Sequence, residues 1–480
     1  MNASLACRAG PWDARFARST KPTSTRAALG SRESVKRLPA LGSAVARLLL
    51  EAVRKGFFFT GVGPSPLRGL ILGWALFPVL LRGAADDWVD RVDEALSVSA
   101  LSGDFRARLS GSAEVEQYHF RQPAPGLIDA GGNDLFNPRL VLFLDAQFRS
   151  HVYAFAQARV DRGFDPGHGP ARLRLDEYAL RYTPGTQGHF NVQIGKFATA
   201  VGNWVPRHGA WDNPFVTAPL PYENLTGMWD LEPVPTDLVL LQWSHVRPGL
   251  PARITAEEKQ RRIPLIWGPS YASGVAISGA FDRVRYALEV KNAGLSSRPA
   301  SWDAVAVGLR HPTWSGRVSY SPDERWNFGW SASTGPYLRP LAEAALAPGR
   351  KLEDHREILL GQDIGFAWHH LQVWAEAYAV RFALPGLGQA DTFAWYTEAK
   401  YKFTPQFFGA VRWNQEFFSR VPDGAGATAA WGRELWRLDL APGYRFTPHT
   451  QFKLQYSLQH ELEGPRPYAH TLATQFMLRF

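Results

Sequence analysis

The residues of this chain most suited to chemistry are lysines and arginines that recur on one face of short segments in which residue types alternate. Positive charges fixed along a water-facing surface attract anions and bias which ions move past them. For any single residue, pairing with a neighbouring segment or contact with lipid headgroups explains the charge equally well. Only four carboxylates share these faces, namely Glu289, Glu398, Glu416 and Asp439, so the excess carries the inference. The basic candidates are Arg106, Arg108, Arg181, Arg285, Lys291, Lys400, Lys402, Arg412, Arg437, Arg445 and Lys453.

A second group of candidates lies in a stretch, 199–235, where the alternation stops. A long loop rich in polar and aromatic side chains carries function more often than its flanking elements do. Two placements remain open for it: an external cap, or an inward fold that narrows an enclosed passage. The candidates for that narrowing are Trp204, Arg207, His208, Trp211, Asp212, Tyr222 and Glu223.

Catalysis finds little support in the residue pattern. His369 and His370 are adjacent, and neighbouring residues of a strand point to opposite faces, so the pair cannot ligate one metal without a break in the strand. No Gly-x-Ser-x-Gly motif occurs, and the single cysteine, Cys7, lies in the leader, which excludes cysteine nucleophiles and cysteine metal sites. The sequence therefore predicts no enzyme activity, no cofactor and no metal site.

The elements that carry the charged faces are β-strands. Phe476, Leu478 and Phe480 alternate with Met477 and Arg479 at the end of the chain, and the segments 434–446 and 450–461 alternate in the same way. A strand that spans a membrane in a barrel turns apolar side chains to lipid and mostly polar ones to the lumen. Such strands produce a period of two rather than a continuous apolar block.

Short turns built from an aromatic residue, a serine or threonine, and a proline separate these strands, at 182–184, 320–322, 403–405 and 446–448. Proline cannot donate to a strand ladder and suits the first position of a turn, so it stops a strand where it stands. An aromatic ring just before it suits the membrane interface. Tight turns at one end and long loops at the other are typical of an up-and-down barrel.

We therefore predict an all-β fold: a transmembrane antiparallel up-and-down β-barrel over 104–480, with 86–103 as a short periplasmic segment that includes a helix near 87–96. The strand count is about 18, and 16 stays open because some segments alternate weakly. A barrel of this size leaves an aqueous channel. The predicted strands are 104–118, 138–148, 151–161, 171–183, 188–198, 236–246, 251–258, 271–281, 283–293, 304–320, 325–334, 357–369, 371–383, 391–403, 406–418, 434–446, 450–461 and 468–480.

The basic excess of the chain, +9, comes from residues 1–85, which hold 13 lysines and arginines and only three acids. The rest is close to neutral, and this excludes the basic face that nucleic-acid binding needs. Within this leader, an apolar run at 69–81 and the small residues 83–85 have the form of a signal peptide. We expect a translation start assigned upstream of the natural one, which would lie within 53–67; a genuinely long leader is the alternative.

Gly195-Lys196-Phe197 closes a strand and Gly202 follows, and this stretch resembles the Gly-Lys-Phe-x-x-Pro-Phe-Gly stretch of the phosphate-selective porin O and P family. Ala200 and Val201 stand where that family has proline and phenylalanine. The resemblance implies a general porin with a loop after this strand. The resemblance does not license a transfer of the family's phosphate preference or of any arginine or lysine ladder.

These features predict an outer-membrane porin for passive diffusion of small hydrophilic solutes or ions, weakly favouring anions. The alternatives are a closed outer-membrane barrel that acts as an adhesin, scaffold or surface enzyme, and a soluble exported carbohydrate-binding β protein. The expected partners are outer-membrane lipid and lipopolysaccharide, small solutes or anions, and the barrel-assembly machinery, through the strand that ends at Phe480. A homotrimer is compatible with the pattern, and no nucleic-acid partner is expected.

Overall fold

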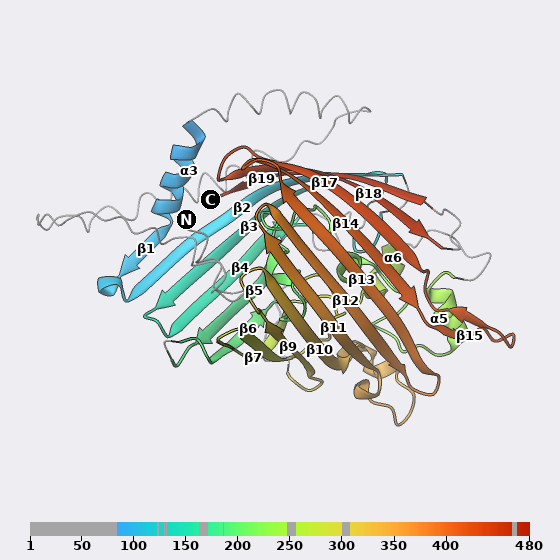
Figure 1. Ribbon diagram of the computed structural model, residues 1–480. Coiled ribbons are helices and arrows are strands. Elements are labelled where there is room, and N and C mark those ends of the chain that lie inside the picture. Colours follow the sequence, from blue (N-terminus) through green and yellow to red (C-terminus); the bar gives the residue numbers. More distant parts are fainter. Residues whose placement is uncertain are drawn as a thin grey trace, which may run out of the picture. The chain divides into compact units, whose positions relative to one another are not determined.

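The computed structural model describes residues 84–121, 124–128, 130, 132–162, 171–185, 187–246, 256–299, 308–462 and 468–480. Within them, sixteen antiparallel strands form one sheet that closes on itself, because β19 (Tyr468–Arg479) pairs with β2 (Phe105–Phe120). Every other barrel strand pairs with its neighbours in chain order. Figure 1 shows the long strands β11 to β14 lying side by side. The predicted all-β, up-and-down antiparallel barrel is confirmed.

The other barrel strands have the bounds β3 (Asp134–Phe148), β4 (Val152–Asp161), β5 (Arg172–Tyr182), β6 (Asn191–Phe197), β7 (Ala272–Phe281), β8 (Val284–Lys291), β9 (Thr313–Tyr320), β10 (Trp326–Pro336), β11 (Arg356–Trp368), β12 (Leu371–Leu384), β13 (Gly388–Lys402), β14 (Phe407–Phe418), β17 (Leu435–Arg445) and β18 (Thr450–Glu461). A separate hairpin of β15 (Arg420–Pro422) and β16 (Thr428–Ala430) lies between β14 and β17.

The two faces of the barrel wall differ as the alternation predicts. On the outer face, large apolar side chains such as Trp314, Leu360 and Leu288 are about 60% exposed. On the inner face, charged side chains such as Glu376 and Arg412 are almost completely buried. An apolar outside and a polar inside are typical of a barrel that spans a membrane.

Two predicted strands, 236–246 and 251–258, are wrong, and this accounts for sixteen strands instead of eighteen. Residues 237–243 form helix α5 (Asp237–Trp243), and helix α6 (Ala256–Arg261) occupies the end of the second range, whose remainder, 251–255, lies outside the described residues. The Thr236 hydroxyl accepts a hydrogen bond from the Val239 amide at 3.2 Å and caps α5. A short apolar run does not by itself distinguish a strand from a buried helix. None of the helices in the described part of the chain is long and apolar enough to cross a bilayer.

Residues 198–271 therefore form one long connection between β6 and β7, which we call the inner loop; it is described except at 247–255. It includes the short helix α4 (Leu220–Glu223) and a 3-10 turn, η3 (Val205–Arg207). Its buried apolar residues, among them Val201 and Met228, share one hydrophobic cluster with Tyr378 and Phe382 of β12. The inner loop thus packs against the inner face of the barrel wall.

The predicted Thr-Pro turns form as expected. The Thr404 hydroxyl accepts a hydrogen bond from the Phe407 amide at 2.9 Å, and the Thr447 hydroxyl accepts from the amides of His449 and Thr450. These turns and the short turn at 369–370 lie at one end of the barrel, which we call the turn end. The opposite end is called the loop end.

The segment before the barrel forms helix α3 (Ala84–Ala95), close to the predicted helix, and strand β1 (Ser97–Ala100). β1 pairs with residues 105–108 of β2, beyond the point where β19 stops. Where β19 stops, the Phe480 amide donates to the Gly111 carbonyl oxygen at 3.0 Å, and the Gly111 amide donates to the Phe480 carbonyl oxygen at 2.9 Å. The apolar run predicted at 69–81 lies outside the described residues.

Candidate functional site

The inner loop is fixed first at Glu376, on the inner face of β12. One carboxylate oxygen of Glu376 accepts from the amides of Asn203 and Trp204, the latter at 2.8 Å, and the other accepts from the Tyr222 hydroxyl at 2.6 Å. The Tyr378 hydroxyl lies 3.1 Å from the same oxygen. A buried carboxylate is stable only when its oxygens are satisfied, and here loop donors satisfy both of them.

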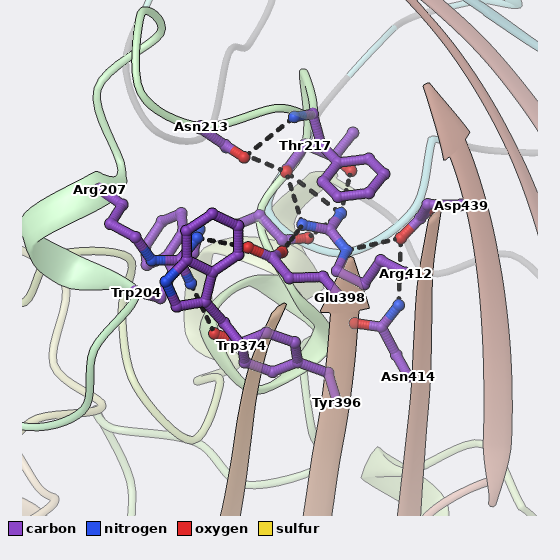
Figure 2. A network of polar contacts seen from close by, with 12 residues as sticks. Trp204, Arg207, Asn213, Thr217, Trp374, Tyr396, Glu398, Arg412, Asn414 and Asp439 are labelled. Carbon is purple, nitrogen blue, oxygen red and sulfur yellow. Dashed lines mark hydrogen bonds and ion pairs between the residues drawn. The ribbon is translucent and has the colours of Figure 1, made fainter. Parts of the chain in front are cut away.

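Arg207 is the second contact between the inner loop and the wall. Its guanidinium pairs with Glu398 of β13 and lies 4.1 Å from the ring centroid of Trp374. Figure 2 shows Arg207 and Trp374 facing each other beside Glu398. Burial disfavours the charged guanidinium, but Glu398 raises the pKa of Arg207 above its ordinary value, so it stays charged.

Arg412, on β14, is fully buried and bridges the wall and the inner loop. Its Nε donates to Asp439 of β17 at 2.8 Å. Its terminal nitrogens donate to the carbonyl oxygens of Thr217 at 3.2 Å and Ala218 at 3.1 Å, and Phe215 stacks on it at 4.2 Å. Figure 2 shows Arg412 between Thr217 and Asp439. This predicted lining residue therefore faces the loop rather than water.

Lys453 and Arg437 are held in the same way. The ammonium of Lys453 donates to the carbonyl oxygens of Ala210, Asn213 and Phe215, at 2.8, 3.0 and 3.1 Å. Arg437 pairs with Glu223 of α4. Burial raises the pKa of the Glu223 carboxyl, and Arg437 opposes that rise. Three predicted lining cations thus serve as anchors of the inner loop.

The four predicted acids are all buried, with at most 2% of each residue exposed. Asp439 pairs with Arg412 and Glu398 with Arg207. Glu289 lies 3.4 Å from the predicted cation Lys291, and Glu416 accepts from the Asn224 amide at 2.8 Å. Three of these four carboxylates are thus paired with interior cations, and the fourth is hydrogen-bonded to a neutral amide.

The cations nearer the turn end are more accessible. Arg106 and Lys402 are exposed, and Arg108, Arg181, Arg285 and Arg445 are half-buried. The inner loop reaches this level: Trp211 lies 4.8 Å from the guanidinium carbon of Arg445 and 3.8 Å from that of Arg479. The loop therefore runs inside the barrel toward the turn end instead of only covering the loop end.

The remaining loop candidates divide by exposure. Trp204, Trp211, Tyr222 and Glu223 are buried, while Asp212 is exposed. His208 is half-buried, and its Nε2 lies 2.9 Å from the Tyr271 hydroxyl. Of the two acids among the seven loop candidates, Asp212 is therefore the one that meets solvent inside the barrel.

Several interior charges were not among the candidates from sequence. Glu376 and the pair of Arg317 with Asp363, at 2.7 Å, belong to β9, β11 and β12. Arg139 contacts Glu114 and Glu116 at 3.2 and 3.1 Å. The signal was present, because Glu114 and Glu116 occupy alternate positions of one strand and so share a face.

Among the described residues, no group of three or more histidine, cysteine, aspartate or glutamate side chains could hold a metal ion. His369 and His370 form the turn between β11 and β12, where His369 has a φ of 50°. The His370 ring contacts the Lys402 carbonyl at 2.9 Å. The pair is part of a turn.

Comparison with known proteins shows only weak likenesses. No protein-family model and no curated protein sequence matches the chain. Among solved structures, OmpF of Salmonella typhi in complex with daunomycin is 12% identical, with a TM-score of 0.48, over 80% of this chain and 100% of that one. The outer membrane channel DcaP of Acinetobacter baumannii is 10% identical, with a TM-score of 0.47, over 80% of this chain and 99% of that one. The anion-selective porin from Comamonas acidovorans is 9% identical, with a TM-score of 0.47, over 78% of this chain and 100% of that one.

Proposed function

We propose that this protein is an outer-membrane channel for small hydrophilic solutes, with a lumen narrowed by the inner loop and a preference for anions. The observation that carries the proposal is a closed barrel with an apolar outer face and a charged inner face, against which a long loop is folded. The outer face suits lipid, and the closed sheet leaves no unpaired edge inside a bilayer. The inner face suits water and ions.

The anion preference follows from how the interior charges are paired. The interior carboxylates of the predicted set are buried in ion pairs or hydrogen bonds. The accessible charges toward the turn end are mainly basic, such as Arg106 and Lys402. An ion in that part of the lumen would meet an excess of positive charge, which favours anions.

The proposal includes the location and the partners. A signal peptide in the leader would direct export, and the strand that ends at Phe480 would engage the barrel-assembly machinery. The outer face would contact lipid and, in the outer leaflet, lipopolysaccharide.

The test is the current through the purified protein in a planar bilayer under a KCl gradient. Stable open steps with a reversal potential on the chloride side would support the proposal. Exchanging two accessible cations, Arg106→Gln with Lys402→Gln, should move the reversal potential toward the potassium side. Leu341→Gln, at an exposed position in 3-10 helix η5 (Pro340–Ala345), is the control and should leave it unchanged.

A closed barrel is the second candidate, and one observation favours it. The loop at 121–133 also contacts the inner loop, since Lys259 donates to the carbonyl oxygens of Ala124 and Ile128 at 2.5 and 2.6 Å. Between these loops and β17 to β19 lies a narrow cavity lined by residues that include Thr217, Glu223, Arg437 and Gln459. A folded, inserted protein that passes no current would select the closed barrel and refute the channel.

A further inference from the structure

One buried lysine of the barrel wall differs from the other three. Lys453, Lys291 and Lys196 each donate to a backbone carbonyl oxygen, at 2.8, 2.9 and 3.1 Å respectively. Lys400, on the inner face of β13, is only 4% exposed. Within the described part of the chain, no oxygen accepts a hydrogen bond from its ammonium, which faces an aromatic ring instead.

That ring holds the lysine in place. The Lys400 ammonium lies 4.3 Å from the ring centroid of Phe408, on β14. Phe408 is buried, and its ring fills the space beside Gly443 on β17, where a Cβ atom would come within 2.1 Å of the ring. The glycine thus makes room for the aromatic floor under the ammonium, and the position of Lys400 is set by packing.

Other charges gather around this ammonium. Arg207 of the inner loop, Lys402 and Arg445 act on it as positive charges, and Asp212 acts as a negative one. Lys402 and Asp212 are exposed, so the cluster borders solvent. Counting Glu398, which pairs with Arg207, four basic groups face two carboxylates, so the local charge stays positive and a mobile anion would improve the balance.

Because no oxygen of the described residues accepts from the Lys400 ammonium, its three donors turn to water or to an anion that takes the place of that water. We infer that Lys400, together with Arg445 and Lys402, forms a binding subsite for a small oxyanion, either a carboxylate or inorganic phosphate. An oxyanion supplies several acceptor oxygens at once, which a halide does not, and charge-assisted hydrogen bonds to it are strong. The role of this subsite in selecting solutes rests on the proposed channel function.

The experiment measures binding directly, without current. Isothermal titration calorimetry of the full-length protein in detergent micelles uses inorganic phosphate and, separately, sodium acetate at constant ionic strength. The wild type should bind at least one of them saturably, and Lys400→Met should bind it at least ten-fold more weakly. Lys351→Met removes the same charge from an exposed position at the loop end and should bind like the wild type.

Folding and function are separated by further measurements. Methionine has a similar length and removes the unpaired charge, so heat-modifiable migration should show a folded barrel. Lys400→Arg keeps the charge and should retain binding better than Lys400→Met. Equal binding by Lys400→Met and wild type, or no saturable binding of either anion by the wild type, would overturn the subsite. Binding without current would refute the channel and leave the subsite standing. Current without binding would refute the subsite and leave the channel standing.

Discussion

The Tyr222 hydroxyl, in the inner loop, lies 2.6 Å from a carboxylate oxygen of Glu376 on β12, and both residues are buried. The other oxygen of Glu376 accepts from the amides of Asn203 and Trp204. One side chain of the wall thus receives two separate parts of the loop.

Glu376→Ala should therefore loosen the inner loop. It removes the acceptor of the Asn203 and Trp204 amides, each of which costs about 1–3 kcal/mol when left unpaired, while the Tyr222 hydroxyl keeps the Tyr378 hydroxyl as a partner at 2.7 Å. In bilayers we expect larger and noisier single-channel currents, with a lower denaturant midpoint. Glu343→Ala, at an exposed position of η5, should change neither. Unchanged currents in folded Glu376→Ala would show that this tether does not limit the passage.

The stability of the barrel should carry a pH signature from Glu223. Its pKa is raised in the folded protein, chiefly by burial, so the group contributes stability that is complete below its ordinary pKa of 4.5. That contribution is lost as pH rises through the folded pKa. Chemical denaturation of wild type and Glu223→Gln across pH 4 to 8 checks this.

Because the glutamine side chain of the Glu223→Gln variant does not titrate, the stability of wild type minus that of the variant should fall as pH rises. The absolute offset includes the lost partner of Arg437, so only the slope is diagnostic. A difference that stays flat, or that grows with pH, would contradict the raised pKa.

The apolar outer face should tolerate charge poorly if it contacts lipid. Leu360, on β11, is 60% exposed, and Leu360→Arg should destabilise the barrel by about 2–4 kcal/mol in lipid vesicles. Leu341→Arg, on the 80% exposed Leu341 of η5, is the matched change outside the strands and should be almost neutral. Equal effects would argue against a lipid-facing belt.

Closure of the barrel should be sensitive to Gly111. A Cβ atom there would lie 2.6 Å from the Val141 carbonyl oxygen and 2.7 Å from Cζ of Phe480. Gly111→Val should therefore cost about 1–3 kcal/mol through overpacking, read as a lower denaturant midpoint. Gly365→Val is the control, because its nearest neighbours lie 3.7 Å or more from the added atom. A wild-type midpoint for Gly111→Val would mean that Phe480 moves aside freely.

Alternation was sufficient to predict all sixteen barrel strands, because a closed barrel imposes a period of two on every segment it includes. It failed at Leu240 and Leu241, which form an apolar run inside α5 and pack within the loop cluster. That burial depends on tertiary contacts, and periodicity over a short run does not reveal them.

The charges of the candidate site were easier to predict than their partners. Arg412 and Asp439 were both expected on the inner face, and they pair at 2.8 Å. The carbonyl oxygens of Thr217 and Ala218 that complete the shell of Arg412 belong to the inner loop. A sequence pattern gives no path for a loop, so it could not distinguish an arginine that lines a passage from one that anchors a backbone.

Strand β1 and the last strand, β19, pair with the same edge of β2 one after the other. β19 stops at Gly111 of β2, and β1 continues the same column of hydrogen bonds along residues 105–108. Without it, the overhanging part of β2 would present a bare strand edge, the feature through which sheets of different molecules stick together. The segment ahead of the barrel thus protects the part of the β2 edge that the last strand is too short to reach.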